Sequence, residues 1–168
     1  MLYRTKMKVA HSGLSGLVLV NLAASAPEGT TNRTPMGSDP VADQLKEFKS
    51  MAFALLRETD ILDCLLPSKN LSFESHAHRL NELRDRVNQL GKLLTKLEAQ
   101  TSVATEGQAM AIEQARPDLV SIAQNLTQAI TLANHNYYNI NGTDYAEAVA
   151  NMYAHATALY NDVDSYRR

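Results

Sequence analysis

The sequence FESHAHRLNELRDRVNQLGKLLTKL, residues 73–97, carries the clearest structural signal of the chain. Its apolar residues recur in alternating steps of three and four, and one histidine falls on the same stripe. The stripe consists of Phe73, His76, Leu80, Leu83, Val87, Leu90, Leu94 and Leu97. This spacing is typical of a helix that packs on other helices along one face. The stretch therefore predicts one long helix with a single buried seam.

Two further segments, 41–66 and 145–166, show the same periodicity. The first follows Asp39, a suitable N-cap, and Pro40, which suits the first helical position. The second follows Thr143, which we expect to be the N-cap of that helix. The predicted seams are Val41, Leu45, Phe48, Ala52, Leu55, Thr59, Leu62 and Leu66 in the first segment, and Tyr145, Val149, Met152, Ala156, Leu159, Val163 and Tyr166 in the second.

A fourth helix is predicted between these, opened by a capping box of Thr105 and Gln108. Its seam is Ile112, Ala115, Leu119, Ile122, Leu126, Ala129 and Ala133. Pro117 interrupts the backbone hydrogen bonds, but the seam keeps its phase across the proline, so we expect one helix kinked at Pro117. Four helices joined by short loops predict an all-α, antiparallel up-down-up-down four-helix bundle with coiled-coil-like packing.

The first 26 residues resemble a secretory signal peptide. Basic residues open the segment, an apolar run of 14–24 follows, and small residues at 23–26 offer a cleavage site. Either Met1 or Met7 can be the start. Residues 27–40 are rich in Pro, Gly, Thr, Asn and Ser, which predicts a disordered linker. The bundle is therefore predicted over 41–168, in a protein that is exported to the periplasm or the extracellular space.

The charge distribution argues against a nucleic-acid partner. The first 26 residues hold three of the 16 basic residues and none of the 18 acidic ones, so residues 27–168 carry a net charge of −5. Binding to a nucleic-acid backbone requires a basic surface. The apolar run near the N-terminus is too short to span a bilayer, so no stable membrane span is expected after signal cleavage.

Several short motifs along the predicted helices form a recognisable set. They are LSFESHA over 71–77, Val87-Asn88, Gly91-Lys92, Leu97-Glu98, Ala111-Ile112 and Pro117-x-Leu119. Over residues 41–166 the chain resembles a family of small, predicted exported helical proteins of bacteria. Its relatives open the third helix with Thr-Pro-Trp, whereas this chain has Thr105-Glu106-Gly107. The resemblance implies export and a helical bundle, and it implies no chemistry.

The predicted topology gathers polar residues at one end of the bundle, where the first and third helices end and the second and fourth begin. Asp63, His76, His135 and Tyr145 are the candidate ligands there for a metal ion or a small molecule. The alternative is that His76 is a core residue satisfied by a carboxylate or a carbonyl. We favour that alternative, because helical metal ligands normally occur in pairs three or four residues apart.

Enzymatic chemistry has little support in the sequence. No nucleophile elbow, phosphate-binding loop or metalloprotease pair occurs, and no metal or cofactor is expected. Met51 and His155 could in principle bind a haem, but both lie beside their seams. The single cysteine, Cys64, excludes an internal disulfide and is predicted to be a buried, inert thiol.

Tyr153 and Tyr160, seven residues apart, form a stripe that flanks the seam of the last helix. They either add packing against a neighbouring helix or form a surface for a protein partner, because tyrosine is enriched at interfaces. The sequence thus predicts an exported, non-enzymatic bundle that serves as a binding or structural module of the cell envelope. The alternative is a periplasmic bundle that binds a metal ion or small ligand near His76. The oligomeric state is left open.

Overall fold

The computed structural model describes residues 39–66, 73–135 and 142–166, and within these ranges the secondary structure is entirely helical. The elements are α1 (Pro40–Leu65), α2 (Phe73–Glu98), a short 3-10 turn (Thr101–Val103), α3 (Glu106–His135) and α4 (Thr143–Ser165). The predicted signal peptide lies outside the described residues, as does almost all of the predicted linker. Asp39 and Pro40 already form the cap and first residue of α1, so the linker predicted over 27–40 ends before them.

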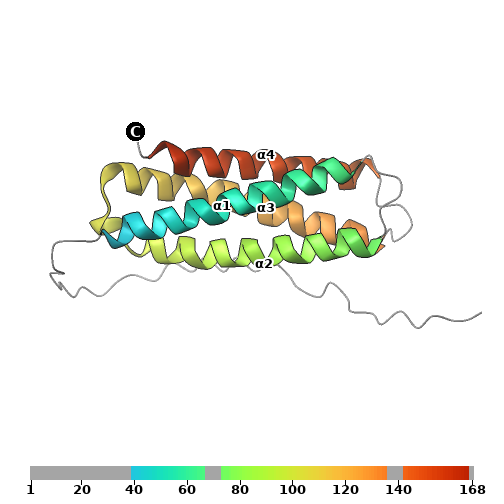
Figure 1. The fold of residues 1–168 in the computed structure, drawn as a ribbon, viewed down its shortest axis with the longest axis horizontal. Coiled ribbons are helices and arrows are strands. Elements are labelled where there is room, and N and C mark those ends of the chain that lie inside the picture. Colours follow the sequence, from blue (N-terminus) through green and yellow to red (C-terminus); the bar gives the residue numbers. More distant parts are fainter. Residues whose placement is uncertain (1–38, 67–72, 136–141, 167–168) are drawn as a thin grey trace, which may run out of the picture.

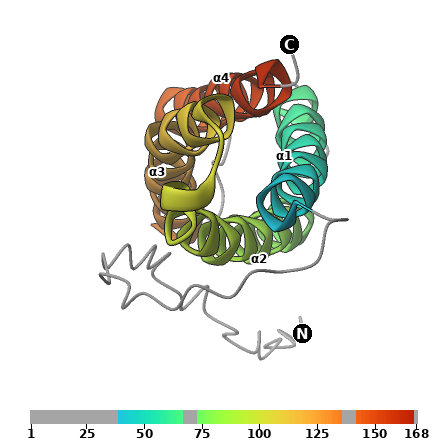
Figure 2. The same cartoon turned by 90° about the vertical axis from the view of Figure 1, so that its left-hand side faces the viewer.

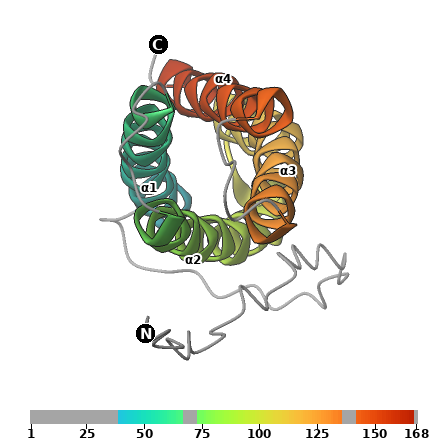
Figure 3. The same cartoon turned by 90° about the vertical axis from the view of Figure 1, so that its right-hand side faces the viewer.

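The four helices run lengthwise along the molecule, each returning beside the one before it (Figure 1). Seen from either end they form a ring in the order α1, α2, α3, α4 (Figures 2 and 3). Each helix packs on its two neighbours in the ring, and α4 closes the ring against α1. This is the all-α four-helix bundle that the sequence predicts.

The buried core lies along the axis of this ring and consists of the predicted seams. Every seam residue whose side chain is described is buried, except the terminal Leu66 and Tyr166, which are partly buried against the core. The side chain of Phe73 lies outside the described residues. Thr59, a polar seam residue, is fully buried, and its hydroxyl donates to the Leu56 carbonyl at 2.8 Å. Burial of these seams is the main favourable contribution to folding.

The helix starts of α1 and α3 are joined by a shared set of capping hydrogen bonds. One carboxylate oxygen of Asp39 accepts from the backbone of Val41 at 3.0 Å and of Ala42 at 3.1 Å. The predicted capping box is confirmed, because the Gln108 side chain accepts from the Thr105 amide at 2.8 Å. The side-chain nitrogen Nε2 of Gln108 donates to the other carboxylate oxygen of Asp39 at 2.7 Å. Gln108, foremost, and the helix amides hold the pKa of Asp39 below its usual value.

At Pro117 the structure confirms one continuous helix, α3, with the proline inside it. The kink itself stays a prediction.

The expected role of Thr143 as the N-cap of α4 is wrong. Thr143 is the first helical residue, and Gly142 takes the capping position in an extended conformation. The Gly142 carbonyl accepts from the amides of Tyr145 and Ala146, both at 3.1 Å. No side chain of the described residues caps this helix start.

Within the described ranges, none of the helices combines the length and the apolar character that crossing a membrane requires.

We predict that Gln108→Ala destabilises the bundle by about 1–3 kcal/mol, because the Thr105 amide loses its acceptor and Asp39 loses a buried donor. Urea unfolding followed by circular dichroism measures the change. The matched control is Gln114→Ala, an exposed glutamine of the same helix, for which a change within about 0.5 kcal/mol is expected. Equal losses in the two variants would contradict the assigned role of Gln108.

Candidate functional site

One end of the bundle, where α1 and α3 end and α2 and α4 begin, is called here the His76 pole. His76 of α2 and Tyr145 of α4 are 1% and 2% exposed. The His76 Nδ1 atom lies 3.1 Å from the Tyr145 hydroxyl oxygen, within hydrogen-bond distance. The two rings are 5.7 Å apart and meet edge to face. The core position predicted for His76 is confirmed, but its partner is a tyrosine of α4 and not the expected carboxylate or carbonyl.

Both groups of this pair are held in their neutral forms. Burial lowers the pKa of His76, and the nearby positive charge of Arg79 lowers it further. Burial likewise raises the pKa of Tyr145 above its usual value. A neutral imidazole and a neutral phenol can share one hydrogen bond without placing a charge in the core. The pair is therefore a structural contact of the closed bundle.

The other predicted ligands of the pole do not join this pair. His135 is exposed, and its Nδ1 donates to the Thr131 carbonyl of its own helix at 2.7 Å. Asp63 is only half-buried near the end of α1. Within the described residues, no three His, Cys, Asp or Glu side chains come close enough to hold a metal ion. A ligand at the His76 pole stays a prediction, and Tyr145 already occupies the Nδ1 atom of the imidazole.

The histidine weighed for haem, His155, is engaged elsewhere. Its Nδ1 atom lies 2.9 Å from a carboxylate oxygen of Asp118 on α3, so the pair joins α3 to α4. Asp162 lies two turns after His155 on α4. Burial raises the pKa of Asp162, and the negative charge of Asp118 and a hydrogen bond to it raise that pKa further. Met51, the other residue weighed, packs against the core from α1. His155 is thus part of a polar contact between two helices.

The prediction that Cys64 is buried is wrong. Cys64 is exposed on the last turn of α1. It follows the buried Leu62 by two residues, which is about 200° around a helix, so its side chain leaves the core face.

Tyr160 of α4 lies against α1, one of the two helices beside α4. Its ring is 5.4 Å from the ring of Phe53, and the Lys49 ammonium lies 5.9 Å from the Tyr160 ring centre. Lys49 also forms an ion pair with Asp164 of α4. Tyr153, two turns away on α4, is 37% exposed. Tyr160 therefore confirms the predicted packing on a neighbouring helix, whereas a partner surface at the stripe stays a prediction.

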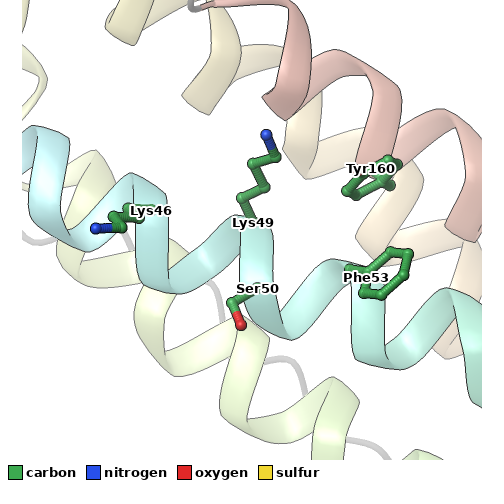
Figure 4. A pocket seen from close by; sticks show the side chains of 5 residues that line it. All are labelled: Lys46, Lys49, Ser50, Phe53 and Tyr160. Atoms are coloured by element: carbon green, nitrogen blue, oxygen red, sulfur yellow. The ribbon is translucent and has the colours of Figure 1, made fainter.

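An open cleft of about 300 Å³ lies on the surface between α1 and α4. It is lined by Lys46, Lys49, Ser50, Phe53 and Tyr160. Figure 4 shows the two rings beside each other, with the Lys49 side chain reaching toward α4 and Lys46 further along α1. We call these five residues the α1–α4 cleft. Phe53 is 47% exposed although its ring contacts Tyr160, so a large apolar surface stays in water.

Phe53 does not stand out from the periodicity of the buried seams, because it directly follows the seam residue Ala52. A signal was nevertheless present. Lys46, Lys49, Phe53 and Arg57 recur at steps of three and four, so they share one outer stripe of α1. That Phe53 lies beside Tyr160 depends on how α1 and α4 are aligned along the bundle, which the sequence does not give.

The buried His76 predicts a loss of stability in mild acid. The unfolded chain takes up a proton near pH 6.5, whereas the folded chain does so only at lower pH because the pKa of His76 is lowered. Its contribution to stability is therefore complete above pH 6.5 and is lost as the pH falls. The slope for one proton is at most about 1.4 kcal/mol per pH unit.

Urea unfolding between pH 7.5 and 5 measures this slope. His76→Gln keeps a hydrogen-bonding group for Tyr145 and removes the titration, so we expect it to flatten the curve. His135→Gln, at an exposed position, controls for the loss of a histidine. An unchanged slope in His76→Gln would assign the acid sensitivity to other groups.

Comparison of the chain with protein-family models, with curated proteins and with solved structures finds no match. The resemblance to small exported helical proteins therefore stays a prediction from the motifs. The function proposed for the chain depends on its own residues, and among the described ones the α1–α4 cleft offers accessible rings and cations together.

Proposed function

We propose that this protein is an exported, non-enzymatic binding module of the cell envelope that holds a protein partner at the α1–α4 cleft. The observation that carries the proposal is the accessible Phe53 ring, packed on Tyr160 and set beside two lysines. Single exposed apolar residues are common on proteins and need no explanation. Aromatic rings that gather in one accessible cleft are characteristic of interfaces, where aromatic residues are enriched.

The chemistry of the cleft supports binding over catalysis. Its side chains are two lysines, a serine and two aromatic rings. The ammonium of Lys49 is neutralised by Asp164 and lies beside a ring, which suits a fixed electrostatic contact. The buried histidine of the molecule, His76, is 1% exposed and is engaged by Tyr145, so it has no direct access to a bound substrate.

The location in the cell envelope is supported by the sequence of the first 26 residues, with its basic start, apolar run and small-residue end. The polar segment 27–40, which holds three prolines, has the composition of a spacer beside the bundle.

We predict that the chain is cleaved on export, after Ala24 or Ser25, because a cut after Ala26 would place Pro27 directly behind the scissile bond. Expression of the full chain in a bacterium, followed by fractionation and mass spectrometry of the N-terminus, measures the site. Replacement of Arg4, Lys6 and Lys8 by glutamate should retain the uncleaved chain in the cytoplasm. Recovery of uncleaved wild-type chain in the cytoplasm would refute export.

We predict that a photo-crosslinking amino acid at position 53 forms a specific adduct with a partner protein in the cells that produce this chain. Position 110 is the matched control, because Met110 is an exposed apolar residue (52%) on α3. The captured partner is then purified, and its affinity is measured for the wild type and for Phe53→Ser, which should bind about tenfold more weakly. Identical adducts from both positions, or equal affinities, would show that the cleft is not the binding site.

A further inference from the structure

We infer that the segment bound by the α1–α4 cleft is an acidic stretch of a partner protein that inserts one apolar or aromatic side chain against Phe53. The inference rests on the proposed binding function and adds the chemistry of the partner.

The size of the cleft indicates a side chain as the inserted group. Pockets that enclose whole small molecules span roughly 300–1,000 Å³ and bury most of the ligand surface. The α1–α4 cleft, at about 300 Å³, is at the bottom of this range and lies open on the outer surface of two helices. It can cover a side chain of a segment that continues along the helices. Phe53 supplies one wall, and its exposed half provides the apolar area that such a side chain would bury.

The exposed charges within two turns of Phe53 on its stripe are the cations Lys46 and Arg57 and the carboxylate of Asp60, and the two cations favour an acidic partner. Lys46 and Arg57 are exposed on the same stripe of α1, eleven residues apart on either side of Phe53, which is about 16 Å along the helix. Lys49 lies between them and is already paired with Asp164. Carboxylates on a partner segment can therefore meet Lys46 and Arg57 while an apolar side chain between them reaches Phe53. Such rim contacts favour the correct partner and speed encounter more than they add affinity.

The neighbouring helix argues for a narrow segment over a broad anionic surface. α4 has no Lys or Arg between Thr143 and Ser165, and it carries Asp144, Glu147, Asp162 and Asp164. Of these four, Asp164 lies on the same side of α4 as Tyr160, so an anionic membrane over this face would meet its carboxylate as well as the α1 cations and would find no cation on α4. A single acidic strand or helix that follows α1 meets the cations and avoids most of that repulsion.

Selection of random peptides displayed on phage against the full chain tests the inference, with counter-selection on the double variant Lys46→Glu/Phe53→Ser. We expect the enriched peptides to carry net negative charge and at least one large apolar or aromatic residue. Peptides that are neutral or basic, peptides recovered equally on the double variant, or an absence of enrichment would overturn it. Vesicles of phosphatidylglycerol provide the second arm, and binding to them that is lost in Lys46→Glu would assign the cleft to a membrane surface instead.

Fluorescence anisotropy then measures the affinity of the best peptide for charge-reversed variants, which isolates the contribution of Lys46. Lys46→Glu should weaken binding about tenfold and make it less sensitive to salt, whereas Lys92→Glu, the same change at an exposed lysine of α2, should leave it within about twofold. Equal effects of the two charge reversals would refute a contact at Lys46. Basic peptides that require Phe53 would refute the acidic chemistry alone, whereas failure of the position-53 crosslink would refute the binding function itself.

Discussion

The packing of four apolar seams against one another is the interaction on which the rest of this structure depends. α2 illustrates it, because residues such as Leu83 and Leu90 are fully buried while the intervening positions hold arginine, aspartate and asparagine. The seams fix which face of each helix turns inward. They thereby also fix which residues of α1 and α4 meet on the outside, and the cleft beside Phe53 is a by-product of that register.

Much of the core follows from periodicity alone, since the described seam positions are buried as their spacing predicts. The buried face of each helix is nonetheless wider than the predicted seam. Leu93, Ala111, Ala123, Ile130 and Ala148 are also buried, all beside the predicted stripe. A helix that packs on two neighbours buries an apolar face at least 100° wide, whereas a strict seven-residue repeat marks only its centre.

The candidate cleft was less predictable from the sequence, for geometric reasons. The tyrosine stripe indicated contact with a neighbouring helix, but the ring that Tyr160 meets comes from Phe53, more than a hundred residues earlier. Residues predicted to meet at the His76 pole were chosen by height alone. Tyr145 does reach His76, whereas the side chain of His135 bonds to the backbone one turn back on its own helix. The sequence indicates which residues lie at the same level along the bundle axis, but it does not indicate where a side chain at a helix end points.

The contacts at the two ends of the bundle differ in charge, so the two ends respond differently to pH. At one end the ionised Asp39 accepts a hydrogen bond from the side chain of Gln108, which lowers the pKa of Asp39, so its carboxylate stays ionised in mild acid. At the other end the contact depends on an imidazole that must stay uncharged. Acidification therefore strains the helices first where His76 and Tyr145 meet, while the opposite end remains clamped.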